Sequence, residues 1–537
     1  MNSSFLTPRR ILIGIAVVAL LLIVRFCTQN SGPEGPSELS IRYEAAPSKI
    51  NPFLSLVFAD IYPCARIFQT MGDLDPATLT LVPIIIKQVP QVYEVTDGPH
   101  KGELAADVEI IPEAAWDNGT PVTAKDIEFS LKLVFHPLIP SKAYLSYFDN
   151  ISEFKIDPAN PKKFTIYYKD YYFMAVEGLL LFPIMPAYNY DPGNKMTNVP
   201  LADFLDSTKL KAFTTDPNMK AFADEFQQPK FLNDPNFVTG SGPYRIETIN
   251  DQGLILVKKE NWWGDKVAER VPLLAAYPNK IIYKVVKDEN VVFNMLKNEQ
   301  LDIVAGSFSP AKYFECKNND SIAAKYDFEV KPPMQYNRWL FNMTKPVIKE
   351  LAVRKALAHI VDYDKAIANI RLGLAERTVS NILPSKPYYN KDIVPYDFNI
   401  KKAQDLLAAA GWADANNDGI LDKVIDGQST RLSIELLVTN VNTSRQYAEM
   451  VTEAARQAGI EIKSVSIDLT ELNPKTRNGD YQTAFLGATL FPGSTEMAQR
   501  YHSNSLAPAG DNRSQLINPA LDSLIDLISS ERDEVKR

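Results

Sequence analysis

The 537-residue sequence is poor in the residues that build disulfide frameworks and metal centres. It has three cysteines and four histidines. Three cysteines form neither a disulfide framework nor a four-cysteine zinc site. No two histidines have the spacing of a metal-binding pair on one helix. We therefore expect no resident cofactor.

The sequence also lacks an excess of positive charge. Its 57 Lys and Arg residues face 65 Asp and Glu residues, which gives a net charge of -8. Nucleic-acid binding needs concentrated Lys and Arg, so no nucleic-acid partner is expected. Hydrophobic residues at 45% and charged residues at 23% are ordinary for globular proteins and exclude global disorder.

Enzyme motifs are missing as well. The sequence contains no Gly-x-Ser-x-Gly, no His-Glu-x-x-His and no Gly-x4-Gly-Lys-Ser/Thr. Gly240–Gly242 begins like a dinucleotide loop, but Pro243 follows and Arg245 stands where the third glycine belongs. No acidic pair has a spacing that supports a glycosidase. We expect a protein that is not an enzyme.

One long apolar run, Ile11–Val24, follows Arg9 and Arg10 and ends at Arg25. As a helix it would span about 21 Å, which is less than a bilayer core of about 30 Å. The run matches the hydrophobic region of an export signal. The basic flank predicts a start in the cytoplasm and an exported body.

The fate of this segment has three alternatives: an uncleaved anchor, a lipoprotein modified at Cys27, and a cleaved signal. Arg25 and Phe26 stand where lipid-attachment sites carry small residues, and no small-x-small cleavage pattern follows. Residues 28–37 are turn formers and predict a tether. We favour a body on the extracytoplasmic side of the cell envelope, anchored to the membrane by its N-terminal segment.

Local signals predict a body of mixed strands and helices. Thr123 and Asp126 form a capping-box pattern at the start of a helix. Asn399 is a helix N-cap and Gly411 the matching stop signal for a helix over residues 400–410. Strand, helix and strand patterns follow one another over residues 432–467, which favours an α/β lobe.

An acidic turn has two interpretations. Its oxygen-bearing side chains have the spacing of the front half of a calcium loop: Asp414, Asn416, Asp418 and Asp422. Ile425 stands where the loop needs a bidentate Glu. We favour a tight turn after the Gly411 stop and keep weak calcium binding as the alternative.

Aromatic clusters at 144–148 and 167–173 either line a ligand cleft or belong to the core, and strand alternation favours the core. Trp262 and Trp263 are adjacent. In extended backbone their side chains point to opposite faces, so we expect one in the core and the other exposed or at a cleft.

Four blocks then resemble one family. Asp117–Asp126 (DNGTPVTAKD) is similar to a signature of the extracellular solute-binding proteins of ABC transporters, family 5, the peptide/nickel type. The Gly-x-Gly-Pro-Tyr hairpin at 240–244 with Trp262–Gly264, the block 341–362 and the block 403–412 follow in the family's order. The resemblance covers about residues 37–537.

The resemblance implies an α/β fold of two lobes, of the class II periplasmic-binding-protein type, with a hinge, an interlobe cleft and an extra subdomain. Lobe I would comprise 37–75, 238–334 and 515–537, with 76–237 as its accessory subdomain. Residues 190–238 look like an insertion or helical excursion. Lobe II would be 335–514, and 1–36 the anchor and tether. Family chains usually continue beyond the stretch 518–525, so we expect either that this sequence is a fragment, with lobe I truncated, or that the rest of lobe I lies on another chain.

The resemblance also implies the function. A peptide or similar solute would be enclosed between the lobes and passed to an ABC permease and its ATPase subunits, without any bond being broken. The alternatives are a membrane-anchored binding or sensory protein without transport, and a ligand that is not a peptide.

The ligand-binding residues carried over from the family are Phe58, Phe485, Gly487, Ala488 and Phe491. Peptide-binding members pair an Asp with the ligand's α-ammonium group, and that position falls near Phe491 here. Glu496 is the nearest downstream acid. We therefore expect either another acid in that role or a ligand other than an ordinary peptide with a free N-terminus.

Overall fold

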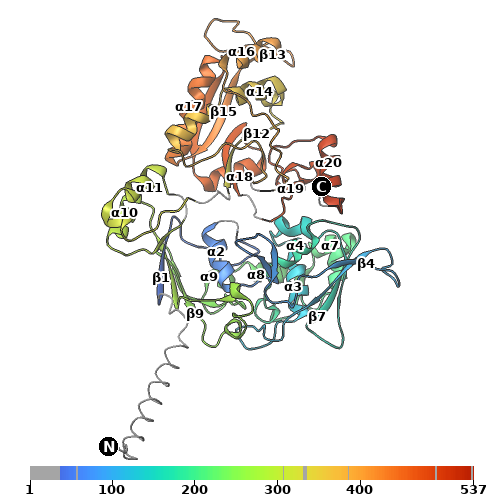
Figure 1. Cartoon of the computed structure of the whole chain (residues 1–537). Coiled ribbons are helices and arrows are strands. Elements are labelled where there is room, and N and C mark those ends of the chain that lie inside the picture. The colour runs from blue at the N-terminus through green and yellow to red at the C-terminus, as the bar shows by residue number, and fades with distance from the viewer. Residues whose placement is uncertain are drawn as a thin grey trace, which may run out of the picture.

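The computed structural model describes residues 37–55, 58–305, 308–330, 335–384, 386, 388–489, 493–533 and 536–537. Figure 1 shows two lobes, which we name by their place in that view. The lower lobe contains the described residues up to 330, and the upper lobe contains 335–489. The C-terminal segment, 493–533, lies beside the junction of the two lobes. The apolar run 11–24 and Cys27 fall outside the described residues, and within these no helix has the length and apolar character to cross a membrane.

A five-stranded sheet of order β11-β1-β10-β9-β8 forms one side of the lower lobe. β1 pairs in parallel with β10 and β11, and β8, β9 and β10 pair as an antiparallel meander. The strands are β1 (Glu38–Tyr43), β8 (Tyr244–Asn250), β9 (Gly253–Lys258), β10 (Lys280–Val285) and β11 (Ile303–Val304). Around them lie α2 (Phe58–Ile67), α10 (Glu289–Lys297), α11 (Pro310–Lys317), α12 (Asp320–Ala323), η2 (Trp263–Lys266), η3 (Pro272–Leu274) and the ribbon β2 (Gly72–Leu74) and β3 (Leu81–Pro83).

A second, antiparallel sheet of order β4-β5-β7-β6 forms the other side of the lower lobe. Its strands are β4 (Val92–Glu94), β5 (Leu104–Glu109), β6 (Ile151–Ile156) and β7 (Lys163–Tyr168). The helices here are α3 (Ala124–Phe135), η1 (Lys142–Tyr147), α4 (Ala175–Leu180), α5 (Ala187–Tyr190), α6 (Leu201–Leu205), α7 (Ser207–Phe213), α8 (Pro217–Phe226) and α9 (Lys230–Asn233). The stretch 190–238 is therefore largely helical, in agreement with the expected excursion.

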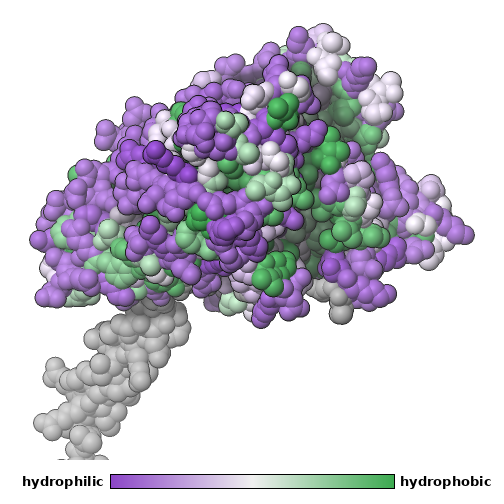
Figure 2. Space-filling view, turned by 90° about the horizontal axis from the view of Figure 1, so that it is seen from above, coloured by the Kyte–Doolittle hydropathy of each residue, from purple (hydrophilic) through white to green (hydrophobic). Residues whose placement is uncertain are grey.

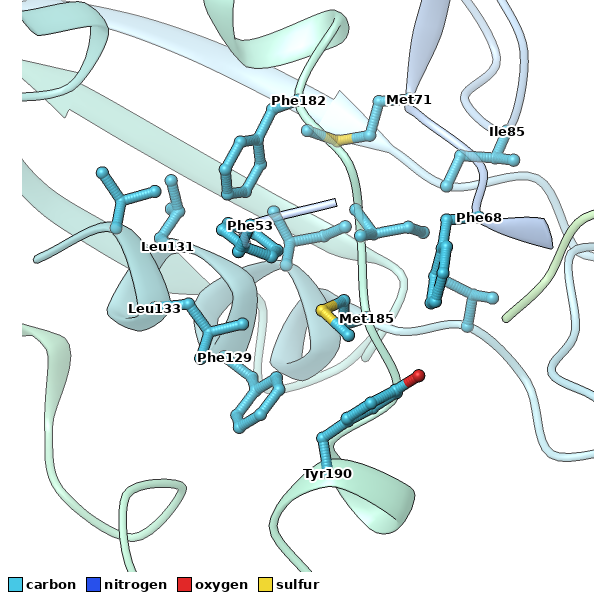
Figure 3. Packing of buried hydrophobic residues seen from close by; sticks show 14 of the residues in the cluster. Phe53, Phe68, Met71, Ile85, Phe129, Leu131, Leu133, Phe182, Met185 and Tyr190 are labelled. Carbon is cyan, nitrogen blue, oxygen red and sulfur yellow. The ribbon is translucent and has the colours of Figure 1, made fainter. Parts of the chain in front are cut away.

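The two sides of the lower lobe share one hydrophobic core. Figure 3 shows Phe53, from the chain before α2, beside Phe182, from the chain after α4, with residues of α3 close by. The ring centroids of Phe53 and Phe182 are 5.4 Å apart. One continuous cluster of buried residues runs from Tyr43 to Tyr283. The predicted accessory subdomain thus packs on the first sheet through a common interior.

The upper lobe is built on one four-stranded sheet of order β12-β17-β15-β16. Its strands are β12 (Gln335–Phe341), β15 (Ser433–Thr439), β16 (Glu461–Ile467) and β17 (Thr483–Thr489). One face packs against α14 (Leu351–His359), α16 (Ile400–Ala409) and α17 (Asn442–Gln457), and the other against α18 (Leu469–Asn478). The remaining elements are α13 (Pro346–Lys349), α15 (Tyr363–Lys365), η4 (Ala366–Ile370), β13 (Asp422–Ile425) and β14 (Gln428–Arg431).

The C-terminal segment contacts both lobes. It contains α19 (Ala498–Tyr501), η5 (Ser503–Ser505) and α20 (Pro519–Ser530). The Met343 amide of the upper lobe donates to the Ser514 carbonyl at 2.9 Å, and the Phe173 amide of the lower lobe donates to the Ser529 carbonyl at 3.2 Å.

Both predicted helix starts are confirmed. The Thr123 amide donates to the Asp126 carboxylate at 2.8 Å, which closes the capping box of α3. The Asn399 side chain accepts the Lys402 amide at 2.9 Å at the start of α16. Gly411 follows α16 with φ +85°, a conformation that glycine adopts without strain.

One of the two adjacent tryptophans was expected to be exposed or at a cleft, and the exposed alternative is wrong. Both Trp262 and Trp263 are buried, and both indole N–H groups donate to the Ser241 carbonyl at 2.8 Å. Trp262 has φ -59° and ψ 136°, but η2 begins at Trp263, so the alternation of an extended strand does not apply and both rings lie on the same side. A Cβ at Gly264 would lie 2.1 Å from the Trp262 ring, so the glycine permits this packing.

The glycines of the Gly-x-Gly-Pro-Tyr hairpin have a packing role. The Gly242 amide donates to the Ile67 carbonyl at 2.8 Å. Cβ atoms at Gly240 and Gly242 would lie 2.3 and 2.6 Å from carbonyl oxygens at the end of α2. The hairpin therefore needs glycine to approach α2, and no phosphate-binding role is required to explain it.

Candidate functional site

The candidate site lies at the end of the upper sheet that is next to the lobe junction. β12 starts at Gln335, shortly after the last described residue of the lower lobe, and β17 ends at Thr489, shortly before the C-terminal segment. The two strands pair antiparallel, with Gln335 opposite Thr489 and Asn337 opposite Gly487. The same end of both strands therefore faces the junction.

β17 carries three of the predicted ligand-binding residues. Gly487 is exposed, and among the described residues a Cβ built there would contact only the Asn337 Oδ1 atom, at 3.6 Å, so these residues leave the space beside its backbone open. Ala488 is partly buried on the opposite face of the sheet. Phe485 shares the face of Gly487, and its ring centroid lies 5.3 Å from that of Trp339. The structure thus places Phe485 and Gly487 together and Ala488 behind them.

The two other predicted residues fall on undescribed positions. Phe58 is the first residue of α2, but its side chain lies outside the described residues, as does all of Phe491. The predicted apolar wall of Phe58 and Phe491 stays a prediction.

An aromatic group beside Phe485 was not expected from the sequence. Trp339 packs against Phe341 at 5.5 Å between centroids, and Tyr447 of α17 lies 6.5 Å from Phe485. The Arg371 Nε–H donates to the Tyr447 hydroxyl at 2.8 Å. The alternation of Trp339 and Phe341 along β12 is the signal that places these two on one face, but the partner strand cannot be read from it.

Acids and phenols line the contact between the lower lobe and the C-terminal segment. Glu177 of α4 is buried, and its carboxylate accepts the Ser494 amide at 2.9 Å. Burial raises the pKa of Tyr147 and of Tyr172, and the charge of Glu496 adds to both shifts. Desolvation and nearby negative charge both disfavour the phenolate, so these tyrosines keep their O–H donors at neutral pH.

Glu496, the nearest downstream acid in the sequence, accepts backbone hydrogen bonds at the start of α19. Its carboxylate accepts the Ala498 amide at 2.6 Å and the Gln499 amide at 2.9 Å at the start of α19. Burial nevertheless raises the pKa of this carboxyl. Glu177 is a second buried acid at this contact, and sequence reasoning missed it because its partner Ser494 lies 317 positions away.

The acidic turn uses its oxygens as acceptors for the backbone. Asp414 accepts the amides of Asp418 at 3.1 Å and Gly419 at 2.9 Å, and Asp418 forms an ion pair with Arg431. Within the described ranges no group of three or more His, Cys, Asp or Glu residues is placed to hold a metal ion. These contacts describe a tight turn. Calcium binding stays an untested prediction.

The aromatic clusters divide between core and surroundings. Phe148 and Tyr168 are buried in the lower core. Tyr168 lies in β7, as strand alternation favoured, whereas Phe148 follows η1. Tyr144, Tyr147, Tyr171 and Tyr172 are only partly buried and pack at its boundary. Figure 2 shows the top of the molecule, where hydrophobic residues gather right of centre and hydrophilic residues cover most of the remaining face.

A groove of about 900 Å³ lies elsewhere, between α17 and the outer strand β16. Polar residues such as Arg445, Glu449 and Ser464 line it together with the apolar Ala448 and Ile462. β16 is at the edge of the sheet opposite to β12. The groove is therefore separate from the candidate site.

Comparison with known proteins identifies the family. Residues 103–505 match the model of the bacterial extracellular solute-binding proteins, family 5 (middle region). The chain belongs to this family. The match includes α3 with its capping box, the Gly-x-Gly-Pro-Tyr hairpin, β12 and β17.

Family 5 relatives align over much of the chain. The oligopeptide-binding protein AppA of Bacillus subtilis is 27% identical over 422 residues, which cover 75% of this chain and 66% of AppA. The nickel-binding periplasmic protein of Escherichia coli is 24% identical over 319 residues, which cover 58% of each protein. The alignments thus span less than two thirds of these relatives.

A solved family 5 structure shares the fold. The structure of AppA from Bacillus subtilis in complex with a nonapeptide superposes with a TM-score of 0.70 at 20% identity. The superposition covers 94% of this chain and 89% of that one. The two-lobed α/β fold predicted from the sequence is thereby confirmed.

Proposed function

We propose that the protein captures a peptide or peptide-like solute between its two lobes and delivers it to an ABC importer. The observation that carries this proposal is the arrangement at the lobe junction. Each lobe has its own core, and the upper sheet presents the open backbone of Gly487 at the end that faces the junction. A backbone without a side chain is where another chain can approach closely.

The mechanism is a change in population rather than a chemical reaction. A solute between the lobes contacts both of them only when they are closed, so its binding favours the closed form. An extended peptide can form backbone hydrogen bonds at a sheet end or edge, which hold it without regard to its side chains. A permease that recognises the closed form then accepts the solute, and ATPase subunits supply the energy.

We also infer that this takes place outside the cytoplasmic membrane, with residues 1–36 as the anchor. The support is the family membership and the apolar run 11–24 between arginines. Fractionation of cells that express the full chain tests it. The protein should sediment with membranes, and a variant that lacks residues 1–36 should not.

Binding is tested with defined probes. The purified body, residues 37–537, is incubated with a mixture of random five-residue peptides, and separately with nickel chloride with and without free histidine. Native mass spectrometry identifies what is retained, and small-angle scattering follows the radius of gyration. Retention of peptides with a smaller radius supports the proposal. Retention of nickel and of no peptide would mean that the solute is a metal ion or metal complex rather than a peptide. An unchanged mass and radius with every probe would refute capture.

A further inference from the structure

Arg338 lies in the middle of β12, on the face of the upper sheet that Ala488 shares. Direct partners across β12 and β17 are Tyr336 with Ala488 and Arg338 with Leu486, and side chains of paired residues point to the same face. Further along this face, Leu340 and Leu486 belong to a small core with Tyr481. Arg338 therefore stands between that core and the end of the strand pair at the junction.

The Arg338 guanidinium has no counter-charge in the described part of the chain. It forms no ion pair there, and its Nε–H is buried without a hydrogen-bond partner. Two other arginines with little exposure show the contrast. Arg513 pairs with Asp511 at 2.9 Å, and Arg42 pairs with Glu44 at 3.1 Å. A partly buried arginine without a partner is unfavourable, because desolvation of the donor is not offset.

The groups around Arg338 favour an anion. Burial and the neighbouring Tyr336 raise the pKa of Tyr501 to about 12, while the charges of Arg338 and Arg500 act in the opposite direction. Burial also raises the pKa of Tyr481, again opposed by Arg338 and by Arg513. Arg513 is already paired with Asp511, and a carboxylate is the complement to the Arg338 guanidinium, which has no counter-charge among the described residues.

We propose that Arg338 is a specificity-determining residue that receives a carboxylate of the captured solute. This rests on the proposed capture between the lobes. The planar guanidinium of an arginine binds a carboxylate through two parallel N–H donors. The carboxylate is either the C-terminus of a peptide or the side chain of an Asp or Glu within it.

Three peptide mixtures separate these sources, and all contain random five-residue peptides. The first has free C-termini and no acidic residues, the second has amidated C-termini and includes Asp and Glu, and the third has amidated C-termini with Asn and Gln in place of the acids. We expect the wild-type protein to retain one of the first two mixtures at least about tenfold more than the third, as a charge-assisted hydrogen bond predicts. The mixture retained identifies the source of the carboxylate.

Variants then assign the preference to Arg338. Arg338→Gln should lose it, and Arg338→Lys should keep part of it, because a single charge remains without the two-pronged geometry. Arg456→Gln, an exposed position on α17, is the matched control and should leave the preference unchanged. Thermal unfolding of each variant verifies folding.

Each result has one meaning. Equal retention of all three mixtures by the wild-type protein would overturn the carboxylate role of Arg338 and leave capture intact, even if the variants do not fold. A preference that survives in a folded Arg338→Gln protein would assign the carboxylate to another residue and refute the proposal. Retention of no mixture would refute capture of peptides itself, and the proposal for Arg338 with it.

Discussion

The lower and upper lobes differ in how their interiors are divided. In the lower lobe the main cluster of buried residues joins both sheets, and a smaller cluster lies among α10, α11 and α12. In the upper lobe a single sheet separates two clusters, one under α14, α16 and α17 and one under α18. Separating the accessory subdomain from the first sheet would expose a shared core, so we expect the two to move as one body. The relative motion that the proposed function requires would then occur at the junction beside β12 and β17.

The lobes also differ in how buried cations are treated. Lys259 in the lower lobe donates to the Asp117 carboxylate at 2.5 Å and to the Gly240 carbonyl at 2.8 Å. Arg338 in the upper lobe has no such partner within the described residues. The first cation completes a fixed contact between the two sides of the lower lobe. The second has no counter-charge among the described residues, and we propose that a solute supplies it.

The largest expected effect is on the shared core. Phe182 is fully buried and its ring contacts Phe53 and Phe148. Phe182→Ala should cost about 3–5 kcal/mol, the usual loss for a buried phenylalanine. Calorimetry should show that the transition of the lower lobe moves down while that of the upper lobe stays.

The matched variant is Leu436→Ala, in the core of the upper lobe, which should move the other transition by a loss of about 2–5 kcal/mol. Phe237→Ala, with 40% of the side chain exposed, should change neither by much. A single transition that both core variants lower together would show that the lobes unfold as one unit. It would contradict the view that their interiors are separate.

The next effect concerns the contact between the two sides of the lower lobe. Burial lowers the pKa of Lys259, and Asp117 opposes this shift. Asp117→Asn removes the counter-charge and should cost about 1.5–3 kcal/mol, the range for a hydrogen bond to a charged group. Chemical denaturation measures it. If the lower lobe then unfolds in two steps, its sides are less strongly joined than the common core implies.

Short-range signals explain what could be predicted from the sequence. The Thr123–Asp126 cap, the Asn399 cap and the Gly411 stop each depend on residues within a few positions, and all three appear as expected. The fold followed from four blocks in order rather than from any one of them. Local rules failed at Trp262 and Trp263, where a short η2 replaced the assumed extended backbone.

Long-range pairing explains what could not be predicted. The register of β12 on β17 joins residues about 150 positions apart, and it alone puts Trp339 beside Phe485. Alternation shows which residues share a face, but the choice of partner strand depends on the whole sheet. The surroundings of Arg338 could not be predicted either, because the lack of a counter-charge among the described residues is a property of the folded chain.

A smaller change tests the open end of the upper sheet. Gly487→Val adds a side chain whose Cβ has ordinary contact distance to Asn337, and β-branched residues suit a strand. Stability should stay within about 0.5 kcal/mol, while retention of the five-residue peptides should fall about tenfold or more, equal to about 1.4 kcal/mol. Unchanged retention in native mass spectrometry would show that the peptide does not bind beside Gly487. The end of the upper sheet would then not be the ligand-binding site.

The smallest expected effect is a pH dependence that belongs to the lower lobe alone. The His100 ring lies between Glu103, at 2.9 Å, and Glu153, at 2.6 Å, and the hydrogen bond to Glu103 is the main cause of its raised pKa. A raised pKa means that the contribution to stability is complete below the unfolded value of about 6.5 and is lost as pH rises through the folded value. These side chains are partly exposed, so solvent reduces the effect.

His100→Gln should therefore lower the transition of the lower lobe most at about pH 6, with a difference that shrinks as pH rises, while the upper transition stays the same. A difference that is constant with pH would show that the ring acts only through packing on Tyr167, on which it stacks at 4.0 Å.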